Sequence, residues 1–410
     1  MSIQTFTWME RYVVTNVISF TEIFTPGTLP QHTYNNRSSL DLEQNLLDSL
    51  ETRGFLTSIS GPSKSGKTVL CESVIGRDNL LLITGGGINL ETEFWDRLST
   101  KFNHKLTYQT ARVNANGSFQ PFSRPQGQYS FSGVNGAELL NAISTYGFTV
   151  VIDDFHYIER SIQISLSQQF KEAIREDAKI VVVSVSHRSD DAIRANPDLR
   201  GRVNSIDIPY WRPDELRYIP ETGFQLLNVA FNSSTLDRIV HESLSSPQLM
   251  QALCLELCRN QNLRVFSPSL KRVNLTVAEL DDVFEKTTQL ANCSSAFDIV
   301  SSGPKTRGAA RNQYTFSDGS TGDVYTSILK AISSCEPQLS FSYNDIKDKV
   351  ENIIQGDPPR GVSLTQALQQ MDKIVLEKLG EDRVLEWDDE KMTLDIPDPY
   401  FLYFLRWSSN

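Results

Sequence analysis

The chain has 410 residues, of which 39% are hydrophobic and 22% charged, and this composition is that of a folded protein of two or three domains rather than a disordered one. Lys and Arg number 39 against 50 Asp and Glu, so the formal net charge is −11. Such an acidic chain lacks the broad basic surface that sequence-independent nucleic-acid binding needs, although one small basic patch is compatible with it.

The five cysteines are scattered along the chain, at positions 71, 254, 258, 293 and 335. Their number and spacing exclude a disulfide scaffold and a zinc site, so we expect buried thiols in a reducing compartment. The first 20 residues include Glu10 and Arg11 among short apolar stretches, and no apolar run reaches about 18 residues. We therefore expect a cytoplasmic protein with no membrane partner.

In chain order, residues 1–36 are polar and aromatic and predict an N-terminal arm with at most one strand. Leucines recur on one face of residues 38–53, which predicts a helix. Short apolar runs then alternate with helical patterns; the expected strands are 55–60, 80–84, 149–153, 180–185 and 205–208, and the expected helices are 67–75, 91–102 and 162–175. Strands that are apolar on both faces and separated by helices indicate a parallel sheet covered on both sides.

Residues 107–136 interrupt this alternation with Gly, Ser, Asn, Gln and aromatic residues, and predict an insertion that forms a long loop or a small hairpin. Either a functional loop or a plain surface insert fits this composition. The chain is mainly helical over 211–292 and polar over 293–316. Near the C-terminus, three amphipathic helices and a hairpin are typical of a winged helix, and a last helix is expected to dock on the body or to bind a partner; the ranges are 324–333, 343–354, 364–379, 383–396 and 396–407.

The strongest motif is GPSKSGKT at residues 61–68, which matches the P-loop pattern G-x-x-x-x-G-K-[ST] between a predicted strand and a predicted helix. Its glycines allow the main chain to wrap around phosphates, and its amides meet them at the start of the helix. Lys67 is expected to reach the β- and γ-phosphates, and the Thr68 hydroxyl to hold Mg²⁺. We therefore predict ATP and Mg²⁺ as cofactors, with nucleotide contacts from Gly61, Pro62, Ser63, Lys64, Ser65, Gly66, Lys67, Thr68 and Val69.

Two carboxylates, Asp153 and Asp154, end the apolar run at 150–152, and open α/β sheets bind their ligands at the carboxyl ends of strands. We expect Asp153 to hold Mg²⁺ and Asp154 to polarise the attacking water, the alternative being a simple strand-end cap. Ser184, Ser186 and His187 lie near the end of the next strand, and one of them either senses the γ-phosphate or only caps that strand.

The spacing between the two motifs bears on the class of enzyme. Lys67 and Asp153 are 86 residues apart, and 56 remain once the 30-residue insertion is set aside. That length accommodates at least one more strand between the two motif strands. The order favours ATPases with an extra catalytic acid over simple nucleotide kinases.

Together with the segments at 197–202 and 208–216, these motifs resemble the AAA+ and STAND ATPases. Within them the chain looks like the bacterial and archaeal STAND-type ATPases whose lid is followed by a winged helix, and more distantly like the origin-recognition ATPases. The resemblance covers about residues 37–265. It implies an α/β fold with a P-loop NTPase parallel sheet, an AAA+/STAND-like core, a helical lid and a C-terminal winged-helix domain.

The resemblance also implies roles for residues outside the two motifs. Arg200 and Arg202, with Arg188 as a lesser candidate, match the position from which an Arg reaches the nucleotide of a neighbouring subunit. Pro247 belongs to a lid element near the base. Arg37 lies in the segment that lines the adenine pocket, the alternative being a solvated residue at a helix start. Asp154 replaces the Glu usual in AAA+ motors, which leaves slow hydrolysis or a switch-like role open.

The predicted domains are an arm (1–36), a P-loop ATPase core (37–210), a helical lid (211–292), a linker (293–316) and a winged-helix domain (317–410). Residues 321–410 contain 9 Lys and Arg against 16 Asp and Glu, a net charge of −7, and the expected wing tip at 388–390 is acidic. Such a surface does not neutralise phosphates, so we expect a protein-interaction or packing module rather than a DNA-binding one.

The function expected from the sequence is that of a STAND-like regulatory ATPase. ATP binding, with slow hydrolysis to ADP, would control assembly of a homo-oligomer or binding of a partner protein of the same system, as in bacterial anti-phage defence or signalling. The alternative is an AAA+ ATPase that acts on DNA in replication initiation or transposition, and the acidic charge disfavours it.

Overall fold

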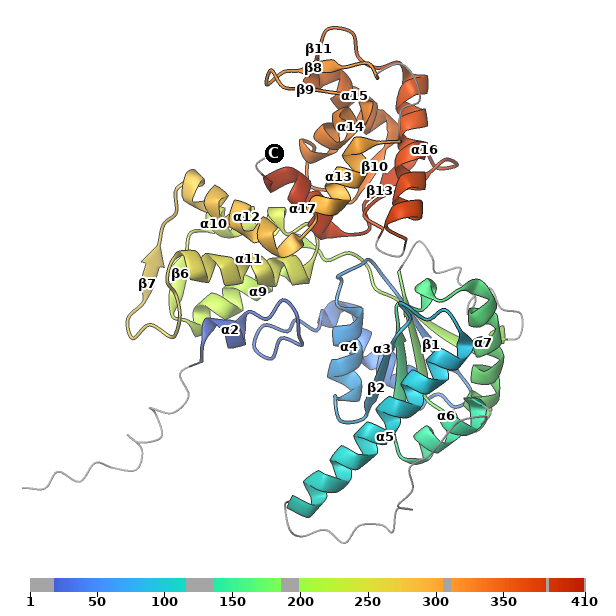
Figure 1. The fold of residues 1–410 in the computed structure, drawn as a ribbon. Coiled ribbons are helices and arrows are strands. Elements are labelled where there is room, and N and C mark those ends of the chain that lie inside the picture. The colour runs from blue at the N-terminus through green and yellow to red at the C-terminus, as the bar shows by residue number, and fades with distance from the viewer. Residues whose placement is uncertain (1–17, 116–135, 186–198, 305–310, 381–382, 409–410) are drawn as a thin grey trace, which may run out of the picture. The chain divides into compact units, whose positions relative to one another are not determined.

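The computed structural model describes residues 18–115, 136–185, 199–304, 311–380 and 383–408, and the chain divides into two units (Figure 1). The core unit comprises residues 36–62 and 66–209. The helical unit comprises residues 1–35, 63–65 and 210–410. In the described ranges, no helix combines the length and the apolar character needed to span a membrane.

The core unit alternates strands and helices. In order, its described elements are η1 (Ser38–Leu40), α3 (Leu42–Glu51), β1 (Leu56–Ser60), α4 (Lys67–Ile75), β2 (Leu80–Thr84), α5 (Glu91–Ala115), α6 (Gly136–Thr145), β3 (Thr149–Asp153), η2 (Phe155–Tyr157), α7 (Arg160–Arg175), β4 (Ile180–Ser184) and β5 (Val203–Asp207). The five expected strands and the P-loop helix are confirmed, with ends that differ by no more than two residues.

The five strands form one parallel sheet in the order β2-β3-β4-β1-β5. In space β4 lies between the P-loop strand β1 and the acidic strand β3, and in sequence β2 separates them, as the spacing of the motifs predicted. The register aligns Ser60 with Ser184, so the ends of β1 and β4 lie side by side. The carboxyl ends of all five strands lie at the same end of the sheet, and this end holds the P-loop and Asp153.

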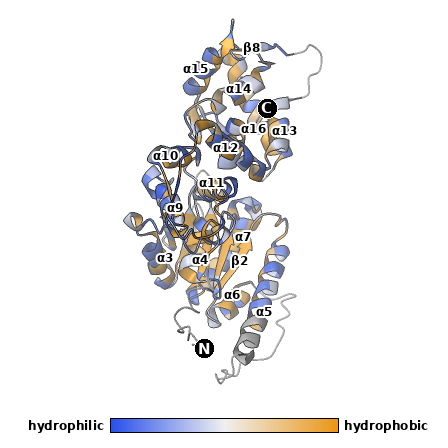
Figure 2. Ribbon diagram, turned by 90° about the vertical axis from the view of Figure 1, so that its left-hand side faces the viewer, coloured by the Kyte–Doolittle hydropathy of each residue, from blue (hydrophilic) through white to orange (hydrophobic). Residues whose placement is uncertain are grey.

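Alternate residues of the strands feed two apolar layers, one on each face of the sheet. On one face, Ile59 and Val181 pack with buried residues of α3 and α4, such as Leu46 and Leu70. On the other face, the layer includes side chains of α5, α6 and α7, such as Phe170. Figure 2 shows the strands as a hydrophobic band between helices of mixed polarity. The predicted sheet covered on both sides is confirmed.

The insertion begins later than expected. Residues 107–115 continue α5 to Ala115 instead of forming a loop or hairpin, so the expected end of this helix at 102 is wrong. The polar composition of this stretch suggested a loop, but Lys105, Gln109 and Arg112 are all good helix formers. The remainder of the predicted insertion, residues 116–135, lies outside the described residues.

The helical unit contains many short elements. Its described elements are α2 (Phe20–Ile23), α9 (Pro213–Leu226), β6 (Val229–Phe231), α10 (Ser233–Glu242), α11 (Pro247–Asn260), β7 (Lys271–Val273), α12 (Val277–Ala291), α13 (Ser294–Ser302), β8 (Tyr314–Phe316), β9 (Thr321–Gly322), α14 (Val324–Ser333), β10 (Ser340–Ser342), α15 (Tyr343–Ile353), β11 (Ile354–Gln355), α16 (Gly361–Lys378), β12 (Glu386–Asp388), β13 (Thr393–Asp395) and α17 (Pro399–Trp407).

The described part of the N-terminal arm belongs to this unit and contains a helix rather than an extended strand. Phe20–Ile23 forms α2, and Ser19 makes a single bridge to Val265. Phe24 packs on Phe224 of α9 with ring centroids 5.2 Å apart. Gly223 makes this packing possible, because a Cβ there would lie 2.3 Å from the Phe24 ring. The described part of the arm is therefore held against α9 by an aromatic contact.

The last third of the chain follows the order that the sequence predicted. Helices α14, α15 and α16 are followed by the hairpin β12–β13, and β10, between the first two helices, pairs with β13 to complete a three-stranded sheet. A second small sheet, β11-β8-β9, was not predicted. The predicted linker is also largely structured, since α13 packs on α14 and α16 and Tyr314–Phe316 is a strand.

Helices α10, α11 and α12 and the C-terminal third contribute to one cluster of buried apolar residues within the helical unit. The closing helix α17 provides much of the contact. Its Tyr403 is fully buried and donates from Oη to the main-chain oxygen of Phe284 in α12, at 2.8 Å. Trp407 lies against the ring of Phe284 with centroids 4.7 Å apart. The docking of this terminal helix on the body is confirmed within the helical unit.

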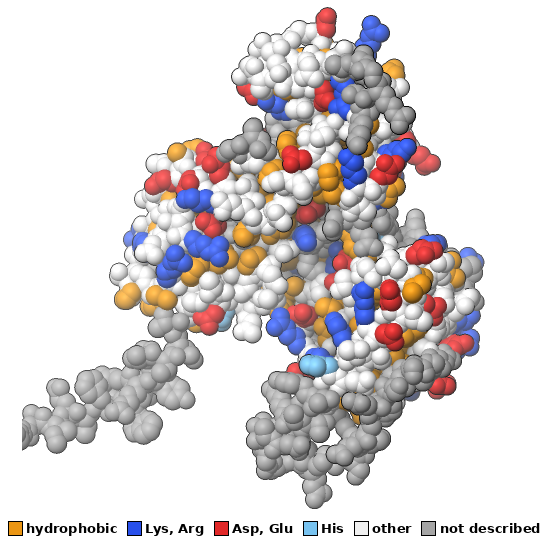
Figure 3. All heavy atoms as spheres, viewed as in Figure 1, with side chains coloured by type: hydrophobic (Ala, Val, Ile, Leu, Met, Phe, Trp, Pro, Cys, Tyr) orange, Lys and Arg blue, Asp and Glu red, His pale blue; other side chains and the backbone are white. Residues whose placement is uncertain are grey.

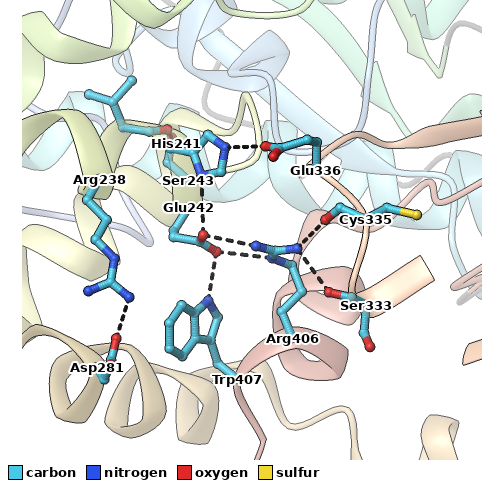
Figure 4. Close-up of polar contacts among 11 residues, drawn as sticks. Arg238, His241, Glu242, Ser243, Asp281, Ser333, Cys335, Glu336, Arg406 and Trp407 are labelled. Carbon is cyan, nitrogen blue, oxygen red and sulfur yellow. Dashed lines mark hydrogen bonds and ion pairs between the residues drawn. The ribbon is translucent and has the colours of Figure 1, made fainter. Parts of the chain in front are cut away.

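A buried polar cluster joins the same two parts (Figure 4). The carboxylate of Glu242, at the end of α10, receives two hydrogen bonds from Arg406, from Nε at 3.1 Å and Nη2 at 3.0 Å. Trp407 Nε1 donates to it at 2.7 Å. Arg406 Nη1 donates to the main-chain oxygens of Ser333, the last residue of α14, and Cys335, at 2.9 and 2.6 Å. We call these residues the Glu242–Arg406 cluster.

Candidate nucleotide site

The P-loop lies between β1 and α4, as the motif predicted. Two residues of the loop adopt left-handed backbone angles, Lys64 with φ 59° and Gly66 with φ 95°. Gly66 precedes the first residue of α4, and Gly76, with φ 78°, follows the last. Glycine adopts positive φ without steric cost, which explains why the motif requires it where the loop turns into the helix.

Lys67 is buried, with 7% of its surface exposed. Its ammonium group donates to the main-chain oxygens of Gly61 at 2.9 Å and Pro62 at 2.7 Å. The ammonium group of Lys67 therefore lies against the main chain of the loop that precedes α4. An ammonium in this position is placed to meet phosphate oxygens cradled by the same loop.

The two predicted metal ligands lie together. Thr68 Oγ1 donates to Asp153 Oδ2, which joins the first turn of α4 to the end of β3. The other carboxylate oxygen of Asp153 accepts from the main-chain N–H of Asp154 at 3.0 Å. A hydroxyl and a carboxylate oxygen suit Mg²⁺, which in nucleotide sites takes one or two protein ligands together with phosphates and water. No group of three or more His, Cys, Asp or Glu that fits a metal occurs in the described ranges.

Asp154 follows β3 at the same edge of the sheet, with a left-handed backbone (φ 55°) and helix η2 directly after it. The chain turns sharply here, and Gly85, after β2, is required beside it. A Cβ on Gly85 would lie 2.4 Å from the main-chain oxygen of Asp154. The second acid is thus fixed one residue beyond the Asp153 carboxylate, where the sequence placed it.

Ser184 ends β4 next to the end of β1. Its side chain is 1% exposed, and its hydroxyl has no hydrogen-bond partner in the described part of the chain. A buried hydroxyl without a hydrogen-bond partner costs free energy. This cost favours a contact with the γ-phosphate over a plain cap of the strand. The other two candidates for this position, Ser186 and His187, and also Arg188, lie outside the described residues.

Arg37 is buried, with 4% of its surface exposed, so the alternative of a solvated residue at a helix start is wrong. Its backbone is left-handed (φ 51°), and Nη1 donates to the main-chain oxygen of Pro209 at 3.0 Å. This contact joins the segment before α3 to the segment after β5. Pro247, by contrast, is the first residue of α11 in the helical unit and follows the N-cap Ser246. Its role near the base stays a prediction.

Arg200 and Arg202 lie at the other end of the sheet from the P-loop. The main-chain oxygen of Arg202 accepts from Leu56 N at 2.9 Å, at the amino end of β1, and Arg200 is exposed. A strand of five residues separates this end from the P-loop by about 17 Å. Neither arginine is therefore placed to contact a nucleotide in its own subunit. Any contact with a nucleotide would be with that of another copy.

Trp211 is a residue that the sequence did not single out. It is buried, and Nε1 donates to the main-chain oxygen of Ser65 at 2.8 Å. Residues 63–65, the tip of the P-loop, accordingly group with the helical unit. The available signal was an aromatic residue just after the last core strand.

The cysteines match the expectation of buried thiols for the most part. Four are buried and Cys335 is partly exposed. Burial raises the pKa of the Cys71 thiol, which lies in α4 behind the P-loop, and the carboxylate of Asp153 raises it further. Cys71 is therefore a neutral core residue.

Comparison with known proteins supports the fold. No model of a known protein family matches the chain, and no curated protein matches it. Among solved structures, a Walker-type ATPase of Pyrococcus abyssi is similar, with a TM-score of 0.54 and 15% identity over 89% of this chain and 95% of that one. This similarity, together with the sheet order, confirms the predicted α/β fold with a central parallel sheet.

Two further structures are more distant. The ORC2 protein of Aeropyrum pernix has a TM-score of 0.45 and 12% identity, over 94% of this chain and 95% of its own. Cdc6p of Pyrobaculum aerophilum has a TM-score of 0.42 and 13% identity, over 95% of this chain and 99% of its own. At these scores neither adds to the evidence from the fold.

Proposed function

We propose that the chain is a regulatory ATPase that binds ATP with Mg²⁺, hydrolyses it slowly and uses the bound state to control assembly or partner binding. The contact between Thr68 and Asp153 carries the proposal. It brings together, at the start of the P-loop helix, the two oxygen ligands that a Mg²⁺–nucleotide complex needs. In such a complex Mg²⁺ would neutralise phosphate charge.

The surrounding residues support distinct roles. Lys67 would hold the β- and γ-phosphates, and Asp154 would polarise the attacking water. Ser184 would contact the γ-phosphate through its buried hydroxyl. Arg200 and Arg202 would act on the nucleotide of a neighbouring copy, which makes hydrolysis depend on assembly. The short carboxylate Asp154, in place of Glu, favours a switch over a fast motor.

A regulatory role also fits the C-terminal third. The order α14, β10, α15, α16 and the β12–β13 hairpin supports its interpretation as a winged helix. Its acidic charge supports a partner protein rather than DNA. Because the lid and this domain share a core, closure of the lid on ATP would move both as one body.

Calorimetric titration of the full chain with ATP and with ADP, with and without Mg²⁺, tests the nucleotide site. We expect both nucleotides to bind and Mg²⁺ to tighten ATP binding. Light scattering on the same samples tests the switch, with a larger assembly expected in ATP and Mg²⁺ than in ADP. A folded chain that binds neither nucleotide would end the proposal.

Two arginine variants provide the matched control. Arg200→Ala and Arg202→Ala should bind ATP like the parent, because these residues lie at the far end of the sheet, but should hydrolyse it more slowly once assembled. If both variants keep the parent rate at every protein concentration, the contribution from a neighbouring copy is absent.

A further inference from the structure

Helix α3 and strand β5 border a groove of about 890 Å³ in the core unit. This volume is within the range of about 300–1,000 Å³ typical of ligand sites. The groove is lined by Leu40, Leu42, Asn45, Asp48, Ser49, Thr52, Ser60 and residues 204–209. Ser60 is the last residue before the P-loop, and neither the P-loop nor Asp153 lines the groove. It is therefore distinct from the phosphate site.

One wall of the groove is the open edge of the sheet, because β5 pairs only with β1 in the described sheet. Leu56 N donates to Arg202 O at 2.9 Å, and Ile208 N donates to Ser60 O at 2.7 Å. The even-numbered residues of β5 thus face β1. In a parallel ladder the intervening residues direct their main-chain groups the other way, so those of Val203 and Ser205 face the open edge.

The opposite edge of the sheet, β2, is covered, and the contrast is informative. Lys101 of α5 donates to the main-chain oxygen of Leu82, and Arg97 donates to those of Thr84 and Gly86, at 3.4 and 3.0 Å. Lysines and covering helices are common means of blocking an edge strand. The sequence of β5, VNSID, contains neither Lys nor Pro. An edge that is left open beside a helix is suited to strand addition.

The side chains around the groove indicate the chemistry of an occupant. Asp48 of α3 is exposed and carries negative charge, and none of the described residues that line the groove is a Lys, Arg or His. The carboxylate of Asp207 accepts from Ser60 Oγ on the other face of the sheet, the face on which Val203 packs, and does not face α3. Leucine, isoleucine and proline side chains provide an apolar surface beside Asp48. Charge complementarity therefore favours a peptide with a basic side chain flanked by apolar ones.

We propose that this groove binds an extended peptide segment of a partner protein, which adds to β5 as a sixth strand and directs a Lys or Arg side chain towards Asp48. The proposal goes beyond the nucleotide site and does not depend on it. It assigns the core unit a second, protein-binding surface on the side away from β2.

A labelled synthetic peptide, Thr-Val-Lys-Val-Thr-Val, serves as the probe, with fluorescence anisotropy on the full chain. Ser205→Pro removes the N–H on the open edge, and Ser205→Ala is its matched control. We expect Ser205→Pro to weaken binding about tenfold or more and Ser205→Ala to leave it unchanged. Asp48→Asn should weaken binding of this peptide but not of one with Thr in place of Lys. A backbone N-methylated peptide should not bind.

Circular dichroism and ATP binding confirm that Ser205→Pro is folded, and the N-methylated peptide tests the same contact without any variant. The proposal is overturned if the parent chain does not bind the peptide at millimolar concentration, or if N-methylation has no effect. Displacement of the peptide by ATP would assign the groove to the nucleotide base instead. Self-association of the chain that Ser205→Pro abolishes would identify a second copy, not a partner peptide, as the occupant.

Discussion

The core unit and the helical unit hold their parts together in different ways. In the core unit, a five-stranded sheet lies between two apolar layers, and the polar residues of the candidate nucleotide site lie at the carboxyl ends of the strands. In the helical unit, the apolar core is supplemented by a buried ion pair that joins α10 to α17. In the core unit, the polar residues of the candidate site are therefore separate from the apolar layers that stabilise the fold. In the helical unit, a buried charged pair is part of what holds the fold together.

The largest effect tests that separation in the core unit. Lys67→Ala removes the ammonium group that would hold the phosphates, and we expect ATP binding and turnover to be lost. The apolar layers are untouched, so the unfolding midpoint in urea should stay close to that of the parent. Calorimetric titration and urea denaturation measure both. Nucleotide affinity equal to the parent's would show that the loop is not a phosphate site.

The Asp154→Asn variant tests ATP hydrolysis separately from ATP binding at the carboxyl end of the sheet. The amide keeps the shape of the side chain but no longer acts as a base, and we expect hydrolysis to fall about 10²–10⁴-fold. ATP binding should be retained. Phosphate release under single-turnover conditions is the measurement, with Asp153→Asn as a comparison that should also weaken Mg²⁺ dependence. A parent-like rate would make Asp154 a strand-end cap only.

The Glu242–Arg406 cluster is the corresponding test of the helical unit. Arg406→Met leaves a carboxylate that is 5% exposed without its main partner, and breaking a buried pair in this way costs about 3–5 kcal/mol. Lys373→Met, in an exposed pair with Glu377, should change stability by about 0.5 kcal/mol or less. The double variant Glu242→Gln, Arg406→Met should lose less than the sum of its single changes. Urea denaturation of these three variants, of Glu242→Gln alone and of the parent provides the measurement.

The same cluster predicts a pH dependence of stability. Burial raises the pKa of Glu242, but the hydrogen bonds and charge of Arg406, with those of Trp407 and His241, outweigh it, and the pKa is lowered from 4.5. A carboxyl with a lowered pKa contributes stability above its ordinary value and loses it as the pH falls through the folded value. We expect the free energy of unfolding to decrease on acidification below about pH 5, and less so in Glu242→Gln. Equal slopes in parent and variant would contradict this.

The two units also differ in how far the sequence predicts them. The strands of the core unit are continuous apolar runs, and the P-loop and Asp153 are local motifs, so short windows contain the necessary signal. The helical unit depends on contacts between distant residues, such as Glu242 with Arg406, 164 positions apart. No local pattern indicates such a pair. The cluster of buried apolar residues to which α10 and α17 both contribute is therefore not predictable from short windows.

Local composition misled the prediction in a second way. Residues 107–115 were assigned to an insertion because of their polar and aromatic character, yet they continue α5. The burial of Arg37 was equally invisible, because its partner is the main-chain oxygen of Pro209 and not a side chain. Likewise, the hydrogen bond from Trp211 to the P-loop is evident only from the structure, because its acceptor is the main-chain oxygen of Ser65.

The smallest expected effect concerns DNA and the acidic end of the helical unit. Residues 321–410 carry a net charge of −7, and Lys373 of α16 already pairs with Glu377. Non-specific binders show dissociation constants of about 10⁻⁴–10⁻⁶ M at physiological salt, and they need cations that replace counterions. We therefore expect a labelled duplex to bind the full chain more weakly than this, with no change in Lys373→Ala, Lys378→Ala. The full chain is the correct sample, because residues 321–410 share one cluster of buried apolar residues with α10–α12.

Fluorescence anisotropy of the labelled duplex at low and moderate salt provides the measurement. Micromolar, salt-sensitive binding that the double variant abolishes would place DNA on α16 and favour a DNA-linked ATPase over a protein-binding switch.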